Sequence, residues 1–352
     1  MTPTSFLDAF APRRLARAAA AFALGFAAAQ SDAERAGATL TEIRDRGTLL
    51  CGVDTGLPGF AERDDQGRWS GFEIDLCRAY AAAFLGDPRR VRFVPLTTEE
   101  RFEALLDGRA DILLRNTSWT FARDAGLPVS FAGTYYFDGQ GFLAPADLGV
   151  ASARELDGAR ICVQPATTSM LNLTDYAATH GLTFERVLVS TTSEGVEAYQ
   201  AGRCDAFTSD ISALAGARAS LAEPEGHVIL PDIISKEPLG PVVASGDPRF
   251  AEAARWVLNA LIAAEEYGVT AENAAELAGT ARSPEIRRLL GAEGAIGEAL
   301  YLRGDFALDA VTARGNYGEI FERHLGTDGL GLRRGLNAQW DEGGLLYAPP
   351  FR

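Results

Sequence analysis

The chain has 352 residues, of which 47 % are hydrophobic and 23 % are charged, which is typical of a folded protein with room for two domains. It carries 48 acidic and 33 basic residues, a formal net charge of −15. This balance argues against a nucleic-acid partner, because contacts to phosphates need concentrated lysine and arginine. The only lysine, Lys236, stands in Ser-Lys-Glu, so the chain has no phosphate-binding loop of the Gly-Lys-Ser/Thr kind.

Residues 1–29 have the pattern of a secretory signal peptide. Arg13, Arg14 and Arg17 form a positive segment, residues 18–29 form a short apolar run, and its small last residues predict cleavage before Gln30. A permanent anchor would need a run of about 18 apolar residues. An amphipathic helix of the mature protein is the weaker interpretation, because no polar face interrupts the run. We therefore expect an exported protein.

The four cysteines fit an exported protein with disulfides. They include no Cys-x-x-Cys pair and the three histidines are scattered, so we expect no metal site. Four free thiols would suit a cytoplasmic protein better than one with this leader. Three pairings are possible, and the order along the chain favours one bridge in each half, Cys51–Cys77 and Cys162–Cys204.

The first part of the chain alternates short apolar runs with helical segments. We expect strands at 48–53, 91–95 and 110–114, a hairpin-like turn at 64–67, and helices at 41–46, 72–84 and 97–106, the last capped by Thr98. This alternation is typical of a parallel α/β sheet.

The pattern restarts after an extended segment at 135–144. We expect strands at 160–163, 182–189, 205–208 and 228–230, helices at 169–180, 193–201 and 211–221, a second extended segment at 238–244, and then helices at 250–265, 271–278, 284–290 and 304–324. The chain thus predicts two α/β units joined by two extended crossings, with the C-terminal helices returning to the first unit. Because open α/β sheets bind ligands beyond the carboxyl ends of their strands, two such sheets can face each other across a cleft.

Several motifs, in order from about residue 40 to the C-terminus, resemble a known family. Residues 52–60 (GVDTGLPGF) and 71–79 (GFEIDLCRA) resemble the start of the polar amino-acid-binding proteins of bacterial ABC importers, solute-binding family 3. The segments that resemble its general L-amino-acid-binding branch are 110–123, 202–210, 235–241, 315–323, 335–340 and 347–350.

The resemblance implies a two-lobed periplasmic-binding-protein fold of type II, in which two open α/β sheets are joined by two hinge strands and extra helices follow. Lobe one would span 40–140 plus 240–352, and lobe two would span 141–239. The implied function is broad capture of free L-amino acids in the periplasm by hinge closure, and delivery to the membrane permease of an ABC importer. We expect a monomer without cofactor or enzymatic activity. The alternative is a periplasmic enzyme on the same scaffold, such as a dehydratase acting on an amino-acid-like substrate.

The resemblance also implies the residues of the first lobe that hold a ligand. Arg123 follows the strand at 110–114 by a short loop and would hold the α-carboxylate through its guanidinium. Beside it, Asn116, Thr117 and Ser118 would contribute backbone groups and a hydroxyl. For an isolated arginine, pairing with the adjacent Asp124 would be the simpler interpretation.

The second lobe supplies the expected opposite contacts. Thr167 and Thr168 follow the strand at 160–163 and open a helix, whose first amides can bind an anion, although this is also the position of an ordinary N-cap. Asp210 follows the strand at 205–208 and would accept the α-ammonium. Its alternative role is to cap the helix at 211–221, and the sequence leaves both roles open.

Three further residues are candidates for shaping selectivity toward the ligand side chain. Asp54 follows the first strand, and Arg101 lies on the helix at 97–106. Leu57 stands where many relatives carry an aromatic lid residue. The simpler interpretations are a turn-forming aspartate and a solvated helix arginine. Charges of both signs without an aromatic lid are compatible with a permissive pocket.

Overall fold

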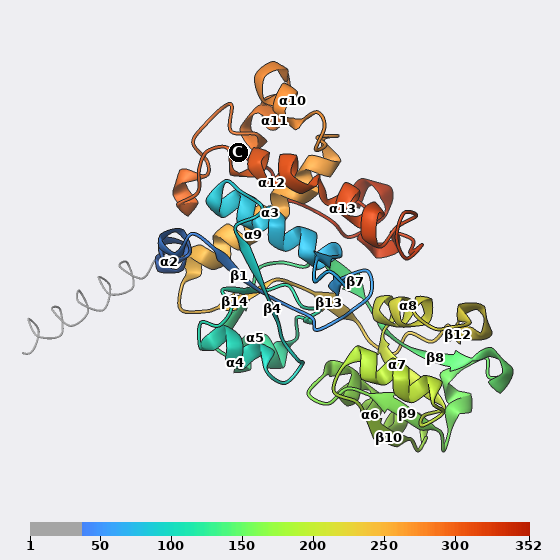
Figure 1. The fold of residues 1–352 in the computed structure, drawn as a ribbon. Coiled ribbons are helices and arrows are strands. Elements are labelled where there is room, and N and C mark those ends of the chain that lie inside the picture. The colour runs from blue at the N-terminus through green and yellow to red at the C-terminus, as the bar shows by residue number, and fades with distance from the viewer. Residues whose placement is uncertain (1–36) are drawn as a thin grey trace, which may run out of the picture.

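The computed structural model describes residues 37–352, so the predicted signal peptide lies outside the described residues. Two five-stranded sheets dominate (Figure 1). The first has the order β4-β1-β5-β14-β6, and its strands are β1 (Leu49–Val53), β4 (Val91–Pro95), β5 (Ile112–Leu113), β6 (Val129–Phe131) and β14 (Val242–Ala244). The second has the order β10-β9-β11-β8-β12, and its strands are β8 (Gln140–Pro145), β9 (Arg160–Val163), β10 (Glu185–Leu188), β11 (Ala206–Asp210) and β12 (His227–Ile229).

We call the first sheet and the helices packed on it the first lobe. Its central helix is α3 (Phe72–Leu85), in which 12 of 14 residues are buried. This helix lies between the sheet and the C-terminal helices (Figure 1). The helices that pack against it are α2 (Ala38–Arg46), α9 (Pro248–Glu266), α12 (Phe306–Arg314) and α13 (Tyr317–His324). Behind these, α10 (Ala274–Thr280) packs on α12 and α11 (Pro284–Leu289) packs on α9. Because α3 is apolar around nearly its whole circumference, it needs a layer on each side.

The second sheet and its helices form the second lobe. Its helices are α6 (Thr168–His180), α7 (Thr192–Gln200) and α8 (Ile211–Ala219). The hydroxyls of Thr167 and Thr191 cap α6 and α7 by accepting a backbone N–H of the first turn. Gly181 ends α6 in the left-handed region, at φ 68°, where a residue with a Cβ is disfavoured.

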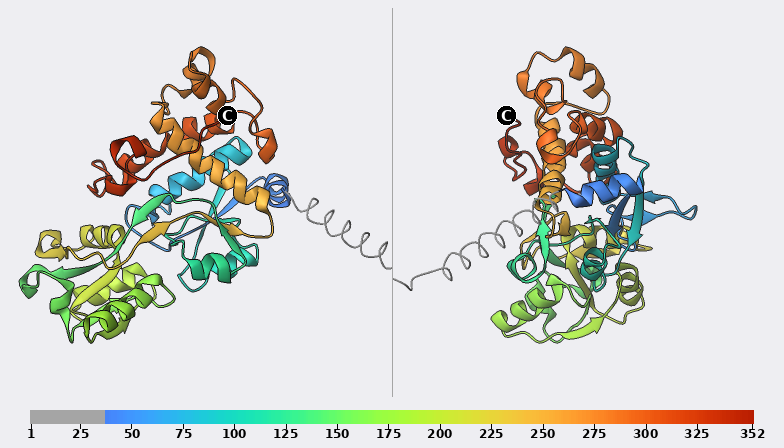
Figure 2. Two further views of the ribbon diagram at one scale, coloured as in Figure 1. Left: turned by 180° about the vertical axis from the view of Figure 1, so that it is seen from behind. Right: turned by 90° about the vertical axis from the view of Figure 1, so that its left-hand side faces the viewer.

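Two short strands run between the lobes. β7 (Tyr136–Asp138) and β13 (Glu237–Leu239) pair antiparallel in a two-stranded sheet of their own. They coincide with the two segments that the sequence predicts to be extended. Seen from two further directions, the lobes are joined through these central segments (Figure 2).

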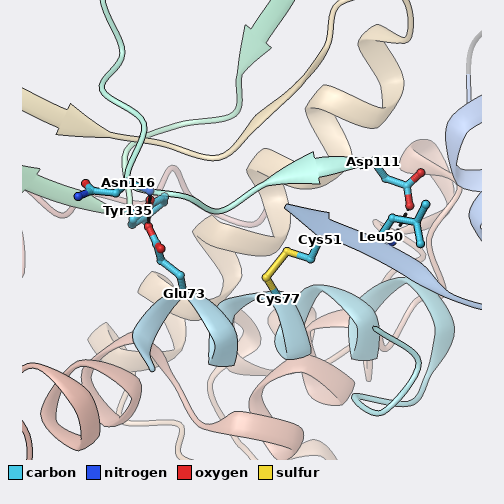
Figure 3. The surroundings of a disulfide bond; sticks show 7 residues. All are labelled: Leu50, Cys51, Glu73, Cys77, Asp111, Asn116 and Tyr135. Atoms are coloured by element: carbon cyan, nitrogen blue, oxygen red, sulfur yellow. Dashed lines mark hydrogen bonds between the residues drawn. A yellow bond between two sulfur atoms is a disulfide. The ribbon is translucent and has the colours of Figure 1, made fainter. Parts of the chain in front are cut away.

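Both predicted disulfides are present. Cys51–Cys77 joins β1 to α3 (Figure 3), and Cys162–Cys204 joins β9 to the residues just before β11. Each bridge therefore lies within one lobe, where it closes a loop and restricts the unfolded chain.

The predicted strands and helices are largely confirmed, with four corrections. The helix expected at 97–106 begins only at Arg101, as α4 (Arg101–Leu106), and Thr98 does not cap it. Two short elements were not expected, α5 (Phe121–Gly126) and β6. The helix expected at 304–324 is broken into α12 and α13, because Gly315 leaves the helical region and Asn316 starts a new helix with a capping box. The helix expected at 271–278 begins later, at Ala274.

Within residues 37–352, no helix combines the length and the apolar character needed to cross a membrane.

Candidate ligand-binding site

A small cavity lies between the lobes. From the first lobe it is lined by residues that follow β1 and β5 or lie in and before α4 and α5: Asp54, Leu57, Thr98, Arg101, Arg115, Asn116, Ser118 and Arg123. From the second lobe it is lined by residues at the carboxyl ends of β9 and β11 or at the start of α6, α7 and α8: Gln164, Thr167, Thr168, Ser169, Thr192, Ser209, Asp210 and Ala213. The carboxyl ends of both sheets therefore face one cavity.

The structure brings nine of the ten predicted site residues to this cavity, and Thr117 is the exception. Its side chain is buried and its hydroxyl donates to the carbonyl of Arg115 at 3.0 Å. Asn116, in the left-handed region at φ 46°, turns the chain here, so that Arg115 before it and Ser118 two residues after it reach the cavity while Thr117 does not.

The lobes are closed over the cavity. The Thr98 hydroxyl donates to the carbonyl of Pro165 in the second lobe at 3.2 Å. The Ser118 and Thr168 hydroxyl oxygens lie 3.4 Å apart, also from opposite lobes. Thr98 thus serves a contact between lobes instead of the helix cap that the sequence predicts.

Three arginines enter the cavity from the first lobe. Arg115 and Asp54 form a buried ion pair with a distance of 2.8 Å between Nη2 and Oδ2. Arg123 donates from Nη1 to the Ser118 carbonyl at 2.8 Å and lies over the Phe102 ring. The third, Arg101, is 2 % exposed, and its Nε and Nη2 have no hydrogen-bond partner among the described residues.

This arrangement gives the arginines different roles. Burial, with Arg115 and Arg123 nearby, lowers the pKa of Arg101 well below its usual value. A buried guanidinium without partners is costly, so Arg101 is the group in the cavity that gains most from an anionic or carbonyl ligand atom. Asp54, which was expected to face a ligand side chain, is already paired with Arg115.

Asp210 supplies the acidic group of the second lobe. It ends β11 directly before α8, and its carboxylate makes no capping hydrogen bond to that helix. Burial raises the pKa of Asp210 well above its ordinary value, and the nearby Asp138 and Glu237 add to the shift. A cationic ligand group would relieve this cost, so the geometry favours the ligand role over the N-cap role that the sequence also allows.

Thr167 and Thr168 lie at the start of α6, but their hydroxyls already have partners. The Thr167 hydroxyl caps the helix and donates to the Gln164 carbonyl at 2.6 Å. The Thr168 hydroxyl donates to Glu237 at 2.9 Å. What this segment turns toward the cavity is therefore the start of the helix, where unpaired amides and the helix dipole favour an anion.

Several lining residues were missed by the sequence reasoning, and Arg115 is the most important. It comes directly after the strand predicted at 110–114, as Asp54 comes directly after the strand at 48–53. The position after a buried strand was therefore an available signal. Gln164, Ser169, Thr192 and Ser209 were missed as well. Gln164 directly follows the strand predicted at 160–163, Thr192 directly precedes the helix predicted at 193–201, and Ser169 and Ser209 adjoin predicted site residues.

A buried network behind the cavity holds Asn116 in place (Figure 3). Glu73, on α3, accepts the backbone N–H of Asn116 at 2.5 Å and also the hydroxyl of Tyr135. The Tyr135 hydroxyl oxygen in turn accepts the same Asn116 N–H at 3.1 Å. Sequence reasoning missed Glu73, which looks like an ordinary residue of the first turn of a helix.

We expect the buried Glu73 carboxyl to make stability pH-dependent. Burial raises its pKa from an ordinary 4.5 to about 7. The unfolded chain loses this proton near pH 4.5 and the folded chain near pH 7, so the contribution of Glu73 to stability falls as pH rises between these values. Across that window, wild type should lose about 3 kcal/mol of stability relative to Glu73→Gln, since one pKa unit corresponds to about 1.4 kcal/mol.

Chemical unfolding of both proteins at pH 5, 6, 7 and 8 checks this expectation. Parallel stability curves for wild type and Glu73→Gln across this range would contradict it.

With this geometry established, comparison with known proteins places the chain. Residues 49–273 match the bacterial extracellular solute-binding proteins, family 3. The chain is 51 % identical over 315 residues to the glutamate/glutamine/aspartate/asparagine-binding protein BztA of Rhodobacter capsulatus. This alignment covers 89 % of this chain and 93 % of BztA. The chain belongs to family 3 of the bacterial extracellular solute-binding proteins.

Two further similarities span nearly the whole of this family 3 protein. It is 46 % identical to the general L-amino acid-binding periplasmic protein AapJ of Rhizobium johnstonii, over 95 % of this chain and 97 % of AapJ. A periplasmic binding protein of an ABC transporter from Brucella ovis, solved with glutathione bound, matches with a TM-score of 0.87 and 50 % identity over 89 % of this chain and 99 % of that chain. The predicted family and its type II two-lobed fold are confirmed.

Proposed function

We propose that this protein captures free L-amino acids in the periplasm and delivers them to the permease of an ABC importer. The observation that carries the proposal is the cavity between the lobes, which Arg123 of the first lobe and Asp210 of the second both line. A free amino acid carries a carboxylate and an ammonium on one carbon, so it can pair with both residues and bridge the lobes. The family and the relatives named above support this role.

The charges in the cavity refine the ligand class. Arg115 and Asp54 neutralise each other, and a zwitterion would pair with Arg123 and Asp210. Arg101 would then remain, buried and with unpartnered donors. We therefore propose broad binding of L-amino acids, with the highest affinity for those whose side chain ends in a carboxylate or an amide. BztA, whose name specifies four such amino acids, supports this ranking.

The proposed mechanism is closure about a hinge. We propose that lobe one comprises 40–140 plus 240–352, that lobe two comprises 141–239, and that β7 and β13 are the hinge strands. The separate sheets, the pairing of β7 with β13, and the packing of α9 and α12 near α3 support this division. Hydrogen bonds from Thr98 and Ser118 to the second lobe would form only on closure.

We further propose that the protein acts as a secreted monomer whose signal peptide at 1–29 is removed, and that it is not an enzyme. Its relatives are binding proteins of transporters. Among the described residues that line the cavity there is no histidine, so a general acid or base would have to be a carboxylate.

Calorimetric titration of the standard amino acids into protein refolded free of endogenous ligand tests the proposed function. Several L-amino acids should bind with a Kd around micromolar, or about 8 kcal/mol. If none binds with a Kd below about 1 mM, or about 4 kcal/mol, the proposal is wrong.

The role of Arg101 predicts a selective loss. Arg101→Met removes the charged donors but keeps an apolar side chain, so binding of L-glutamate should weaken by about 1.5–3 kcal/mol, the range for a hydrogen bond to a charged group. L-Alanine, which has no side-chain acceptor, should bind the variant nearly as it binds wild type. Equal losses for both ligands in the same titrations would contradict a side-chain role for Arg101.

A further inference from the structure

The C-terminal extension, residues 274–352, lies beyond the part of the chain that matches the family, and it contacts the hinge. Phe137, in the middle of β7, donates its N–H to Oδ1 of Asn337 at 2.7 Å. Nδ2 of Asn337 donates to the carbonyl of Phe137 at 3.1 Å. One buried amide therefore satisfies both backbone groups of this residue. Its partner across the two-stranded sheet, Pro238, has no N–H to offer.

Asn337 is itself anchored in the first lobe. Two residues further on, Gln339 donates to the carbonyl of Ile262 on α9 at 3.1 Å. Three residues before it, Arg334 makes two hydrogen bonds to Glu265 on the same helix, at 2.7 and 3.1 Å. Asn337 therefore ties β7 to α9.

The next residue of β7 is held by the other lobe. Asp138 accepts the hydroxyl of Ser212, on α8, at 2.5 Å and its backbone N–H at 3.3 Å. Since Phe137 is bound by Asn337 and Asp138 by Ser212, β7 passes from the first lobe to the second between two adjacent residues.

The second crossing strand, β13, changes lobes at the same level. Glu237 accepts hydrogen bonds from Thr168 and Asn172 of the second lobe, at 2.9 and 2.7 Å. The carbonyl of the following Pro238 accepts the N–H of Trp119, in the first lobe, at 2.7 Å. The register pairs Phe137 with Pro238, and Asp138 with Glu237. The change of lobe is thus aligned across both strands.

We propose that Asn337 is a positioning residue for ligand capture, which holds Phe137 in the first lobe. It thereby confines the hinge to one peptide step in each strand, from Phe137 to Asp138 in β7 and from Glu237 to Pro238 in β13. The proposal rests on the hinge closure proposed above. Without Asn337, the freed backbone groups of Phe137 would turn to water, and the flexible stretch of β7 would lengthen toward its start. The ligand-free protein would then sample more open forms, and closure around any ligand would become less favourable by the same factor.

The test compares Asn337→Ala and Asn337→Asp with Gln339→Ala. Gln339 is a buried amide of the same segment that bonds α9 and not the hinge, and its removal leaves the two Arg334–Glu265 hydrogen bonds to anchor Asn337. The first measurement is hydrogen exchange of the Phe137 amide without ligand. It should speed up at least tenfold in Asn337→Ala, speed up less in Asn337→Asp, whose carboxylate can still accept the Phe137 N–H, and stay near wild type in Gln339→Ala. The second is small-angle scattering of ligand-free protein, in which only the Asn337 variants should have a larger radius of gyration.

The third measurement is calorimetric titration with L-glutamate, L-glutamine and L-alanine. The Asn337 variants should bind all three about tenfold more weakly, by one common factor. The proposal is overturned if Phe137 exchanges in Asn337→Ala as it does in wild type, if Gln339→Ala gives the same changes, or if the loss differs between ligands. If wild type does not bind amino acids, the proposed function is wrong. Hydrogen exchange and scattering need no ligand, so these two measurements would still decide whether Asn337 positions the hinge.

Discussion

Replacing Arg123 by alanine should weaken the binding of every amino acid by about 2–5 kcal/mol, the cost of removing one partner of a buried charged pair. Of the three arginines of the cavity, Arg115 is already paired with Asp54 and Arg101 is deeply buried. Arg123 has no carboxylate partner among the described residues and is less buried than Arg101. We expect it to hold the α-carboxylate, a group that every ligand shares. The loss should therefore be similar across ligands, unlike the selective loss expected for Arg101→Met.

Two variants make this experiment decisive. Arg123→Lys keeps the charge but cannot reproduce the planar pair of donors, so most of the loss should remain. Arg109→Ala removes an exposed arginine outside the cavity and should bind as wild type does. Titration of a panel of acidic, amide and aliphatic amino acids measures the effect. Binding by Arg123→Ala within about threefold of wild type, or roughly 0.7 kcal/mol, would show that the carboxylate is held elsewhere.

Asp75→Asn should cost about 3 kcal/mol of folding stability, because removing one partner of a buried ion pair leaves the others uncompensated. Asp75, on α3, has no exposed surface, and three arginines and a histidine surround its carboxylate. Their nitrogen atoms lie within 2.6–3.0 Å of its oxygens, and the residues are Arg78, Arg314, Arg323 and His324. All but the first belong to α12 and α13, so this carboxylate fastens the C-terminal helices to the central helix.

The same cluster predicts the direction of a pH effect. Burial alone would raise the pKa of Asp75, but hydrogen bonds from His324 and Arg314 outweigh it and hold the pKa well below the ordinary 3.8. A depressed pKa stabilises the fold above the unfolded value, and this stabilisation is lost as pH falls. Wild type and Asp75→Asn should therefore differ most near neutral pH and converge in acid.

Chemical unfolding at pH 7, 3 and 2 measures both statements, because the stabilisation is lost only as pH falls below the ordinary 3.8 toward the depressed pKa of Asp75. Asp87→Asn is the matched control, because Asp87 pairs only with Arg89 at the surface and should contribute little. A loss below about 1 kcal/mol for Asp75→Asn, typical of a surface pair, would contradict the role of Asp75 as an anchor.

The sequence by itself determined most of the elements and their order. An apolar run such as β1 is recognisable because a strand buried in a parallel sheet excludes polar side chains along its whole length. The candidate site positions Asp54, Arg123 and Asp210 were predicted on the same basis, together with the family motifs. They follow the ends of such strands, where the fold leaves side chains free to meet a ligand.

Only the tertiary structure decided what each of these side chains contacts. The sequence treats Asn116, Thr117 and Ser118 alike, yet the left-handed turn at Asn116 removes Thr117 from the cavity. Thr98 has the pattern of a helix cap, but closure of the lobes gives its hydroxyl a partner, Pro165, far along the chain.

Asn337 and Phe137 are the extreme case, since they meet across 200 positions of sequence. Strand and helix formation depend on neighbours within a few residues, so their signals are local and can be read in order. Hydrogen bonds and ion pairs between distant segments depend on how the sheets and helices pack. No periodicity in either segment records which amide will satisfy the free edge of β7, and that choice is made only when the C-terminal extension folds back onto α9.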